Sequence, residues 1–197
     1  MAVSAAPGAS GSYPVRLDIQ YAESLSKLTF AKWILAIPHY LIVYALQIAF
    51  NVISLVAFFA IIFTGEYPRS LFDFAVNTRR WQANVAAYAL LIRDEYPPFS
   101  FDAGLYPVTL EVDYPTNLAR FAPLYKWILA IPHLIIVSVL SLVAFFAVFV
   151  AGFSVLTTGK YPEGIYKFVV GVQRWSMRAQ LYTLFMTDEY PPFSLDP

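Results

Sequence analysis

The chain has 197 residues, of which 59% are apolar and 13% are charged, and its formal net charge is zero. Soluble domains carry about a quarter charged residues, so this composition points to a membrane protein. The balanced charge leaves no basic patch for nucleic acid, and the absence of cysteine excludes disulfides, iron–sulfur clusters, zinc thiolates and cysteine nucleophiles.

The chain begins with a tail and a short strand. Residues 1–12 are mostly Ala, Gly, Ser and Pro without a positive charge, which predicts a disordered tail and not a signal peptide. In the following segment Val15, Leu17 and Ile19 alternate with polar residues. Alternation with a period of two predicts a strand with one buried face.

A boundary segment and a first long helix follow the strand. Lys27, Lys32 and Trp33 suit the membrane–water boundary, so we expect a short interfacial helix there. Pro38 would separate it from a spanning helix, because proline is favoured in a first helical turn. No charge occurs from Trp33 to Phe63, and such a length predicts a transmembrane helix.

A second helix is expected near residues 69–92. The motif "TGEYP" at Thr64 turns the chain, and the paired prolines of "DEYPPFS" at Asp94 end the helix. The adjacent acids Asp94 and Glu95 are interpreted as a solvated helix end.

The whole pattern then occurs a second time. The octapeptide "KWILAIPH" stands at Lys32 and at Lys126, "TGEYP" corresponds to "TGKYP" at Thr158, and "DEYPPFS" recurs at Asp188. We therefore divide the chain into a tail (1–12), repeat 1 (13–100), a linker (101–105) and repeat 2 (106–195).

These elements predict a membrane all-α fold with minor β structure. Each repeat would be a two-helix transmembrane hairpin, giving four membrane helices related by a pseudo-twofold axis, with interfacial helices and with short strands gathered on one side. Basic residues near the termini favour a multi-pass membrane protein with both termini in the cytoplasm.

A polar seam is predicted inside the membrane, because charges and amides recur at helical spacing. Its candidate residues in both repeats are Gln47, Asn51, Asp73, Asn77, Arg80, Asn84, Lys167, Arg174 and Arg178. Such a seam could join helices, lie in water on an interfacial helix, or form a functional pathway or partner surface.

The two histidines, His39 and His133, occupy equivalent positions. Paired imidazoles could ligate a haem or a metal, but a histidine at the start of a spanning helix is also an ordinary interfacial residue. No catalytic triad, phosphate loop or metal motif occurs in the sequence. We therefore expect no enzymatic activity, no metal and no required cofactor.

The ordered motifs "YPVRLDIQY", "KWILAIPH", "TGEYPRSLFDFAV", "RRW" and "LIRDEYPPFS" resemble a bacterial family catalogued only as a domain of unknown function. The resemblance covers residues 13–195. It implies a small integral membrane protein of the bacterial inner membrane with tandem copies, and it supplies no activity and no functional residues.

The function expected from these features is that of a non-catalytic accessory or scaffold subunit, which packs against lipids, other membrane proteins or itself. A small transporter or channel that uses the polar seam is the first alternative. A haem protein with two histidine ligands is the second.

Overall fold

The computed structural model describes residues 13–197, so the predicted tail of residues 1–12 lies outside the described part. The elements in chain order are β1 (Val15–Ile19), α1 (Ala31–Leu35), α2 (Ile37–Thr64), α3 (Arg69–Ala89), β2 (Val108–Val112), α4 (Ala122–Thr158) and α5 (Glu163–Thr183). The same order of strand and helices occurs in both repeats, as the duplication predicts.

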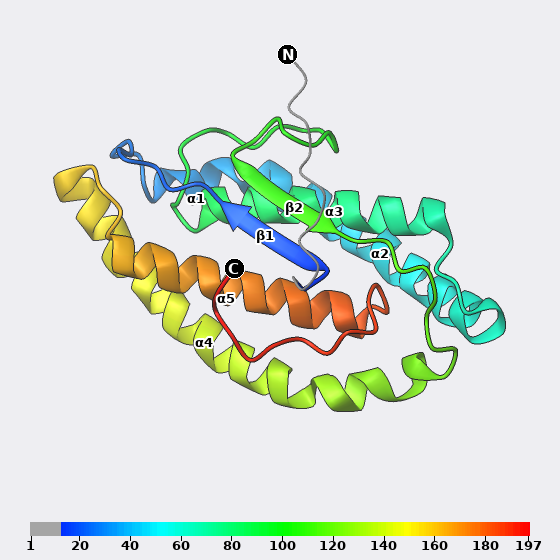
Figure 1. The fold of residues 1–197 in the computed structure, drawn as a ribbon. Coiled ribbons are helices and arrows are strands. Elements are labelled where there is room, and N and C mark those ends of the chain that lie inside the picture. Colours follow the sequence, from blue (N-terminus) through cyan, green and yellow to red (C-terminus); the bar gives the residue numbers. More distant parts are fainter. Residues whose placement is uncertain (1–12) are drawn as a thin grey trace, which may run out of the picture.

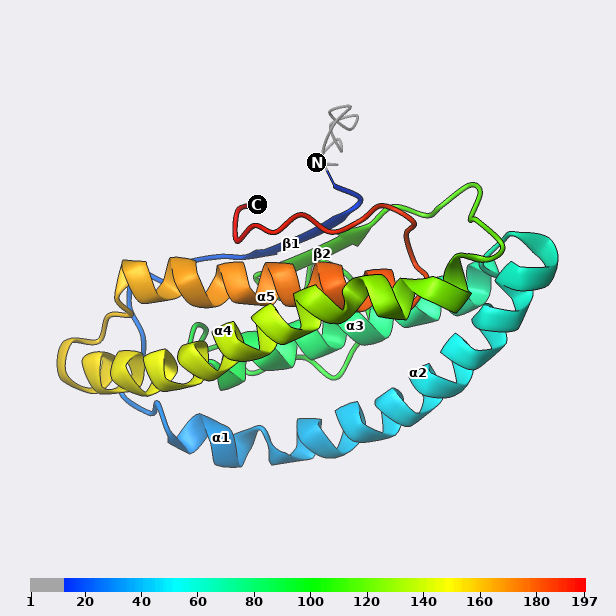
Figure 2. The same ribbon diagram turned by 90° about the horizontal axis from the view of Figure 1, so that it is seen from below.

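The elements form three layers (Figures 1 and 2). The sheet lies on one side, α3 and α5 lie beneath it, and α2 and α4 lie on the side away from the sheet. In Figure 1 the long helices α2 and α4 run along opposite flanks of the molecule in opposite directions.

The two strands pair antiparallel, and Leu17 faces Leu110 at the centre of the register. The alternation predicted from the sequence is present: Val15, Leu17 and Ile19 are buried, whereas Asp18 is exposed. An antiparallel pair has a local twofold axis between its strands. The repeats are therefore related about an axis that passes through the sheet.

Each strand packs on a helix of the other repeat. β1 lies against α5, and β2 lies against α3. The strand ends are fixed in the same crossed manner, because the Tyr21 hydroxyl donates to the Tyr161 carbonyl and the Tyr114 hydroxyl donates to the Tyr67 carbonyl, both at 2.5 Å. Consequently neither repeat has a complete core alone.

Glycine and proline set the turns between long and short helices. Gly65 and Gly159 end α2 and α4 with φ of 79° and 70°, a left-handed conformation that glycine adopts without steric cost. Pro68 and Pro162 immediately precede α3 and α5. These residues reverse the chain, so α3 packs back on α2 and α5 packs back on α4.

The expected set of four membrane helices is not supported. Among residues 13–197 only α2 and α4 are long and apolar enough to cross a membrane. Helices α3 and α5 bury one face beneath the sheet and carry charges such as Arg80 and Arg174 toward it. A helix with such a face is amphipathic and lacks the continuous apolar surface of a spanning helix.

The predicted interfacial helices are present only in part. Repeat 1 has the five-residue α1, which ends at Leu35 just before α2 begins. In repeat 2 the helix is continuous, and Pro132 lies inside α4. The same proline sequence therefore separates two helices in one repeat and is accommodated within a single helix in the other.

Candidate functional site

The repeated motifs form two equivalent ion pairs at opposite ends of the molecule. Lys32 Nζ lies 2.6 Å from Asp94 Oδ1, and Lys126 Nζ lies 2.5 Å from Asp188 Oδ1. Both lysine side chains are 2% exposed, whereas both carboxylates are 32% exposed. The interpretation of Asp94 as a solvated helix end is therefore wrong, since this carboxylate neutralises a buried cation.

Each histidine sits in an aromatic cluster of its own repeat. His133 is fully buried and stacks on Phe193 with a centroid distance of 4.0 Å, and His39 stacks on Phe99 at 4.1 Å. Trp175 supplies an edge contact and a hydrogen bond to His133. The clusters are formed by the "KWILAIPH" helix, the "RW" helix and the "YPPF" segment of one repeat.

These surroundings assign the histidines a structural role. Trp Nε1–H donates to Nδ1 of each imidazole, so that nitrogen is not free to bind a metal. The Nε2 atoms are buried without a hydrogen-bond partner among the described residues. No group of three or more His, Cys, Asp or Glu that could hold a metal occurs within residues 13–197. The haem alternative gains no support from this arrangement.

One part of the predicted seam forms a polar cluster between α2 and α3. Gln47 donates from Nε2 to Asn51 Oδ1 at 2.9 Å and accepts at Oε1 from Gln82 at 3.2 Å. Arg79, which the seam prediction omitted, donates to Gln82 Oε1 at 2.6 Å and lies 4.2 Å above the ring of Phe50. Burial lowers the pKa of the Arg79 guanidinium to about 10, so it stays charged at neutral pH.

Two seam arginines bind the sheet. Arg174 Nε donates to the Leu17 carbonyl at 2.8 Å, and its Nη2 lies 2.6 Å from Asp18. Arg80 Nη2 donates to the equivalent Leu110 carbonyl at 3.4 Å, while Nη1 donates to Asn77 Oδ1 at 2.7 Å. Each arginine thus binds the central residue of the strand that the other repeat contributes.

The remaining seam residues are dispersed. Asp73 and Lys167 are exposed and form ion pairs with residues one turn away on their own helices, Arg69 and Glu163. Asn84 is buried at 3% exposure, with Oδ1 lacking a partner among the described residues. The predicted seam is therefore several local contacts and not one continuous polar line, and the transporter alternative gains no support from it.

Arg178 and Arg79 are the two buried basic residues that form no ion pair among residues 13–197, but Arg79 donates hydrogen bonds to Gln82 and Gln47, whereas Arg178 donates none there. Arg178 is 4% exposed and its guanidinium lies 5.8 Å from the ring centroid of Tyr13, yet it makes no ion pair with any residue of 13–197 and its Nε has no hydrogen-bond partner there. Burial and the nearby Arg174 lower its pKa. The equivalent residue of repeat 1 is the neutral Asn84.

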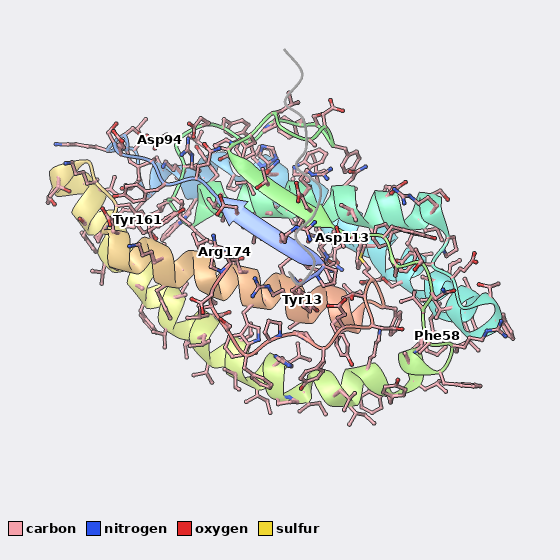
Figure 3. All side chains as sticks on the ribbon, in the orientation of Figure 1. Tyr13, Phe58, Asp94, Asp113, Tyr161 and Arg174 are labelled. Carbon is pink, nitrogen blue, oxygen red and sulfur yellow. The ribbon has the colours of Figure 1, made fainter. Side chains whose placement is uncertain are left out.

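Arg178 lines a groove of about 850 Å³ on the sheet side. Tyr13, Arg174 and the C-terminal segment form its walls, and Figure 3 shows Tyr13 and Arg174 on this side of the molecule. Of the acidic side chains that line the groove, Asp18 and Glu111 pair with Arg174 and Arg16, whereas Glu189 forms no ion pair among the described residues. Arg178 is therefore a buried cation of the groove without a direct ion pair, and a guanidinium binds carboxylate and phosphate groups well.

The opposite side of the molecule carries two exposed apolar stripes, which we call the apolar face. Their residues are between 43 and 73% exposed. The stripe on α2 consists of Leu41, Tyr44, Ile48, Val52, Leu55, Phe59 and Phe63, and the stripe on α4 consists of Leu124, Ile128, Ile131, Ile135, Val139, Leu142, Phe146, Val150 and Phe153. An exposed apolar surface of this extent marks a contact with lipid or protein.

Sequence reasoning missed the residues that hold these motifs together. The sequence analysis does not name Trp81 or Trp175, although the "RW" dipeptide occurs in both repeats, and Arg79 carries no such signal because its equivalent is Gln173. Identity at equivalent positions was the available signal, because a side chain with the same partner in each repeat is kept in both copies.

Comparison with known proteins shows one family. Its model, described as "Domain of unknown function (DUF4389)", matches residues 26–100 and again residues 120–194. No curated protein and no solved structure matches the chain. The two matches confirm a tandem repeat of a domain of unknown function.

Proposed function

This chain belongs to the DUF4389 family, and we propose that it is a non-catalytic membrane protein that serves as an accessory or scaffold subunit. Its two faces differ in chemistry. The apolar face would contact lipid, and the groove around Arg178 would hold an acidic group of another membrane protein or of a second copy.

The observation that carries this proposal is that the buried Arg178 forms no ion pair with any residue of 13–197. A buried guanidinium without a counter-ion costs several kcal/mol of desolvation. Asn84 stands at the equivalent position of repeat 1, so the repeat architecture itself does not require an arginine there. A partner that supplies a carboxylate or phosphate would form an ion pair with the arginine and offset this desolvation cost.

We expect the protein to reside in a bacterial inner membrane. Two helices long and apolar enough to cross a membrane support a membrane location. The basic residues in the segments that precede α1 and α4, among them Lys27 and Arg120, favour the cytoplasmic side of the membrane for these segments.

The test is purification of the tagged chain from native membranes, followed by mass spectrometry and native mass determination. We expect a partner, or a second copy, in fixed stoichiometry with the chain. The variant Arg178→Met should lower the amount of co-purified partner at least tenfold. The variant Lys167→Gln, which removes an exposed charge of the same helix, should leave that amount unchanged. Recovery of the chain alone at monomer mass would contradict the proposal.

A further inference from the structure

The sheet side and the apolar face of the molecule lie at opposite ends of the axis that relates the repeats (Figure 2). We propose that the protein lies flat in a single leaflet, with α2 and α4 parallel to the membrane plane and the sheet in water. This inference rests on the membrane function proposed above and concerns how the apolar face meets lipid.

The first argument is the position of the charges. The outer side of the sheet carries Arg16, whose guanidinium lies 3.2 Å from Glu111 and 2.7 Å from Asp113, and the two carboxylates are 69 and 58% exposed. The strands β1 and β2 lie over α3 and α5, along the length of the helices and not at their ends (Figure 1). If α2 and α4 crossed the bilayer, this exposed charged surface would lie at the depth of the hydrocarbon.

The second argument concerns the backbone of the sheet. Within residues 13–197 the sheet has two strands, so each strand has an outer edge in this part of the chain. Open sheet edges exposed to lipid do not occur in the hydrocarbon region, because their amide groups lack partners there. The flat orientation places both edges in water.

The third argument is the length of the apolar face. From Leu124 to Phe153 the stripe on α4 extends over about 44 Å at 1.5 Å per residue, whereas the hydrocarbon core is about 30 Å thick. A spanning α4 would need a tilt near 47° to bury it, beyond the usual range of about 0–40°. A helix parallel to the membrane buries the stripe at any length.

The aromatic residues and the shape of α2 agree with this orientation. The exposed Tyr44, Tyr125 and Trp127 lie toward the first turns of the long helices, where amphipathic rings prefer the interface. Figure 2 shows α2 bowed away from the sheet, with its C-terminal end rising toward the sheet side. The middle of this helix would be deepest in the leaflet.

Lipid also has room between the two long helices. An apolar cleft of about 410 Å³ is lined by Trp33 and Tyr40 from repeat 1 and by Ser141, Phe145 and Phe149 from α4. We expect acyl chains of the leaflet to fill this cleft.

The flat and spanning orientations differ in which sides of the membrane the two turns reach. Figure 3 shows Asp94 and Tyr161 at one end of the molecule and Phe58 at the other. Because α2 and α4 run in opposite directions, the turn at Glu66 and the turn at Lys160 lie at opposite ends. A spanning orientation puts these turns on opposite sides of the bilayer, whereas the flat orientation puts both on the side of the sheet.

The chain contains no cysteine, so single substitutions can be labelled without background. The matched variants Glu66→Cys and Lys160→Cys occupy equivalent exposed turn positions, and Thr109→Cys marks the exposed side of the sheet. Each full-length variant is expressed in native membranes. A membrane-impermeant maleimide is then applied to right-side-out and to inverted vesicles, with labelling in detergent as the measure of full reaction.

We expect all three variants to react in the same vesicle type, with at least tenfold less labelling in the other. Reaction of Glu66→Cys and Lys160→Cys in opposite vesicle types overturns the flat orientation and leaves the membrane function standing. Recovery of the chain in the soluble fraction overturns the membrane function as well.

A second measurement determines depth. Ile128→Cys, Leu142→Cys and Phe153→Cys, each carrying a fluorophore, are reconstituted in vesicles that contain lipids with a quencher at defined acyl positions. The flat orientation predicts depths that agree within about 5 Å, whereas the spacing of 14 residues from Ile128 to Leu142 allows differences up to about 20 Å along a spanning helix. Absence of quenching at all three positions would show instead that a second protein covers the apolar face, and would overturn the inference.

Discussion

Nε1 of Trp175 donates a hydrogen bond to Nδ1 of His133 over 2.9 Å, and the same bond joins Trp81 to His39 over 3.2 Å in repeat 1. An imidazole nitrogen that accepts a hydrogen bond carries no proton. Both histidines are therefore neutral imidazoles protonated at Nε2. Each is held in place by the tryptophan of its own repeat.

Replacement of Trp175 by Phe should lower the stability of the protein. It removes the donor and leaves Nδ1 of His133 buried and unsatisfied, which costs about 1–3 kcal/mol. Thermal unfolding in detergent measures the loss. Trp127→Phe is the control, because that indole is 57% exposed and donates only to the Leu124 carbonyl of its own helix. Equal effects of the two variants would contradict the assigned role.

The ion pair of Lys126 with Asp188 gives a second prediction. Asp188→Asn leaves a lysine at 2% exposure without its counter-charge. Breaking a buried pair costs about 3–5 kcal/mol, and we expect about 2–3 kcal/mol here because the carboxylate is partly exposed. Denaturant unfolding measures the change, with Glu189→Gln as the neighbouring exposed control. The double variant Lys126→Met with Asp188→Leu should recover most of the loss.

Stability should also depend on pH through the sheet. The Arg16 guanidinium holds the pKa of Asp113 below its ordinary value. A carboxylate with a lower pKa in the folded state stabilises the protein above its unfolded pKa of about 4, and this contribution is lost as the pH falls through the folded value. Asp113→Asn should therefore melt below the wild type at pH 7, and the difference should shrink at pH 3. A difference that stays constant with pH would exclude this pair as the cause.

Arg178→Met should leave the melting temperature unchanged or raise it. Methionine replaces the aliphatic stem of the arginine without burying an unpaired charge, and replacing buried charges by apolar side chains is often neutral or stabilising by about 1–4 kcal/mol. The measurement is thermal unfolding of the purified chain without partner. A large fall in melting temperature would indicate that Arg178 stabilises the fold itself.

Neither repeat should be stable when produced alone. β1 packs on α5 and β2 packs on α3, so a fragment of residues 106–197 lacks the strand that covers its helix. Fragments 1–105 and 106–197 produced together should assemble into one complex, which co-purification through a tag on one fragment would reveal. Independent folding of either fragment as a monomer would contradict the crossed packing.

Sequence reasoning predicted the local elements well. Period-two alternation located β1 and β2, the uncharged stretch located α2, and the expected helix near residues 69–92 corresponds to α3 at Arg69–Ala89. Glycine and proline at the turns have a local conformational effect, so they identify helix ends without knowledge of the fold.

The long-range contacts, both between the repeats and within one repeat, could not be predicted in this way. Periodicity shows that Asn77, Arg80 and Asn84 share a helix face, but it does not show what that face contacts. We assigned the face to a membrane interior, whereas Arg80 contacts a strand that is 30 residues away in sequence. Likewise Lys32 and Asp94 form a pair across the whole of α2 and α3, a separation at which sequence patterns carry no information on distance.

The crossed packing of strands has a consequence for synthesis on the ribosome. β1 is among the first described residues to be translated, yet its pairing partner β2 and its supporting helix α5 are translated only after α2 and α3. The apolar α2 can thus enter the lipid while β1 still lacks neighbours. The water-exposed half of the molecule must wait until translation is almost complete, and an interrupted product would display an unpaired strand to the cell's proteases and chaperones.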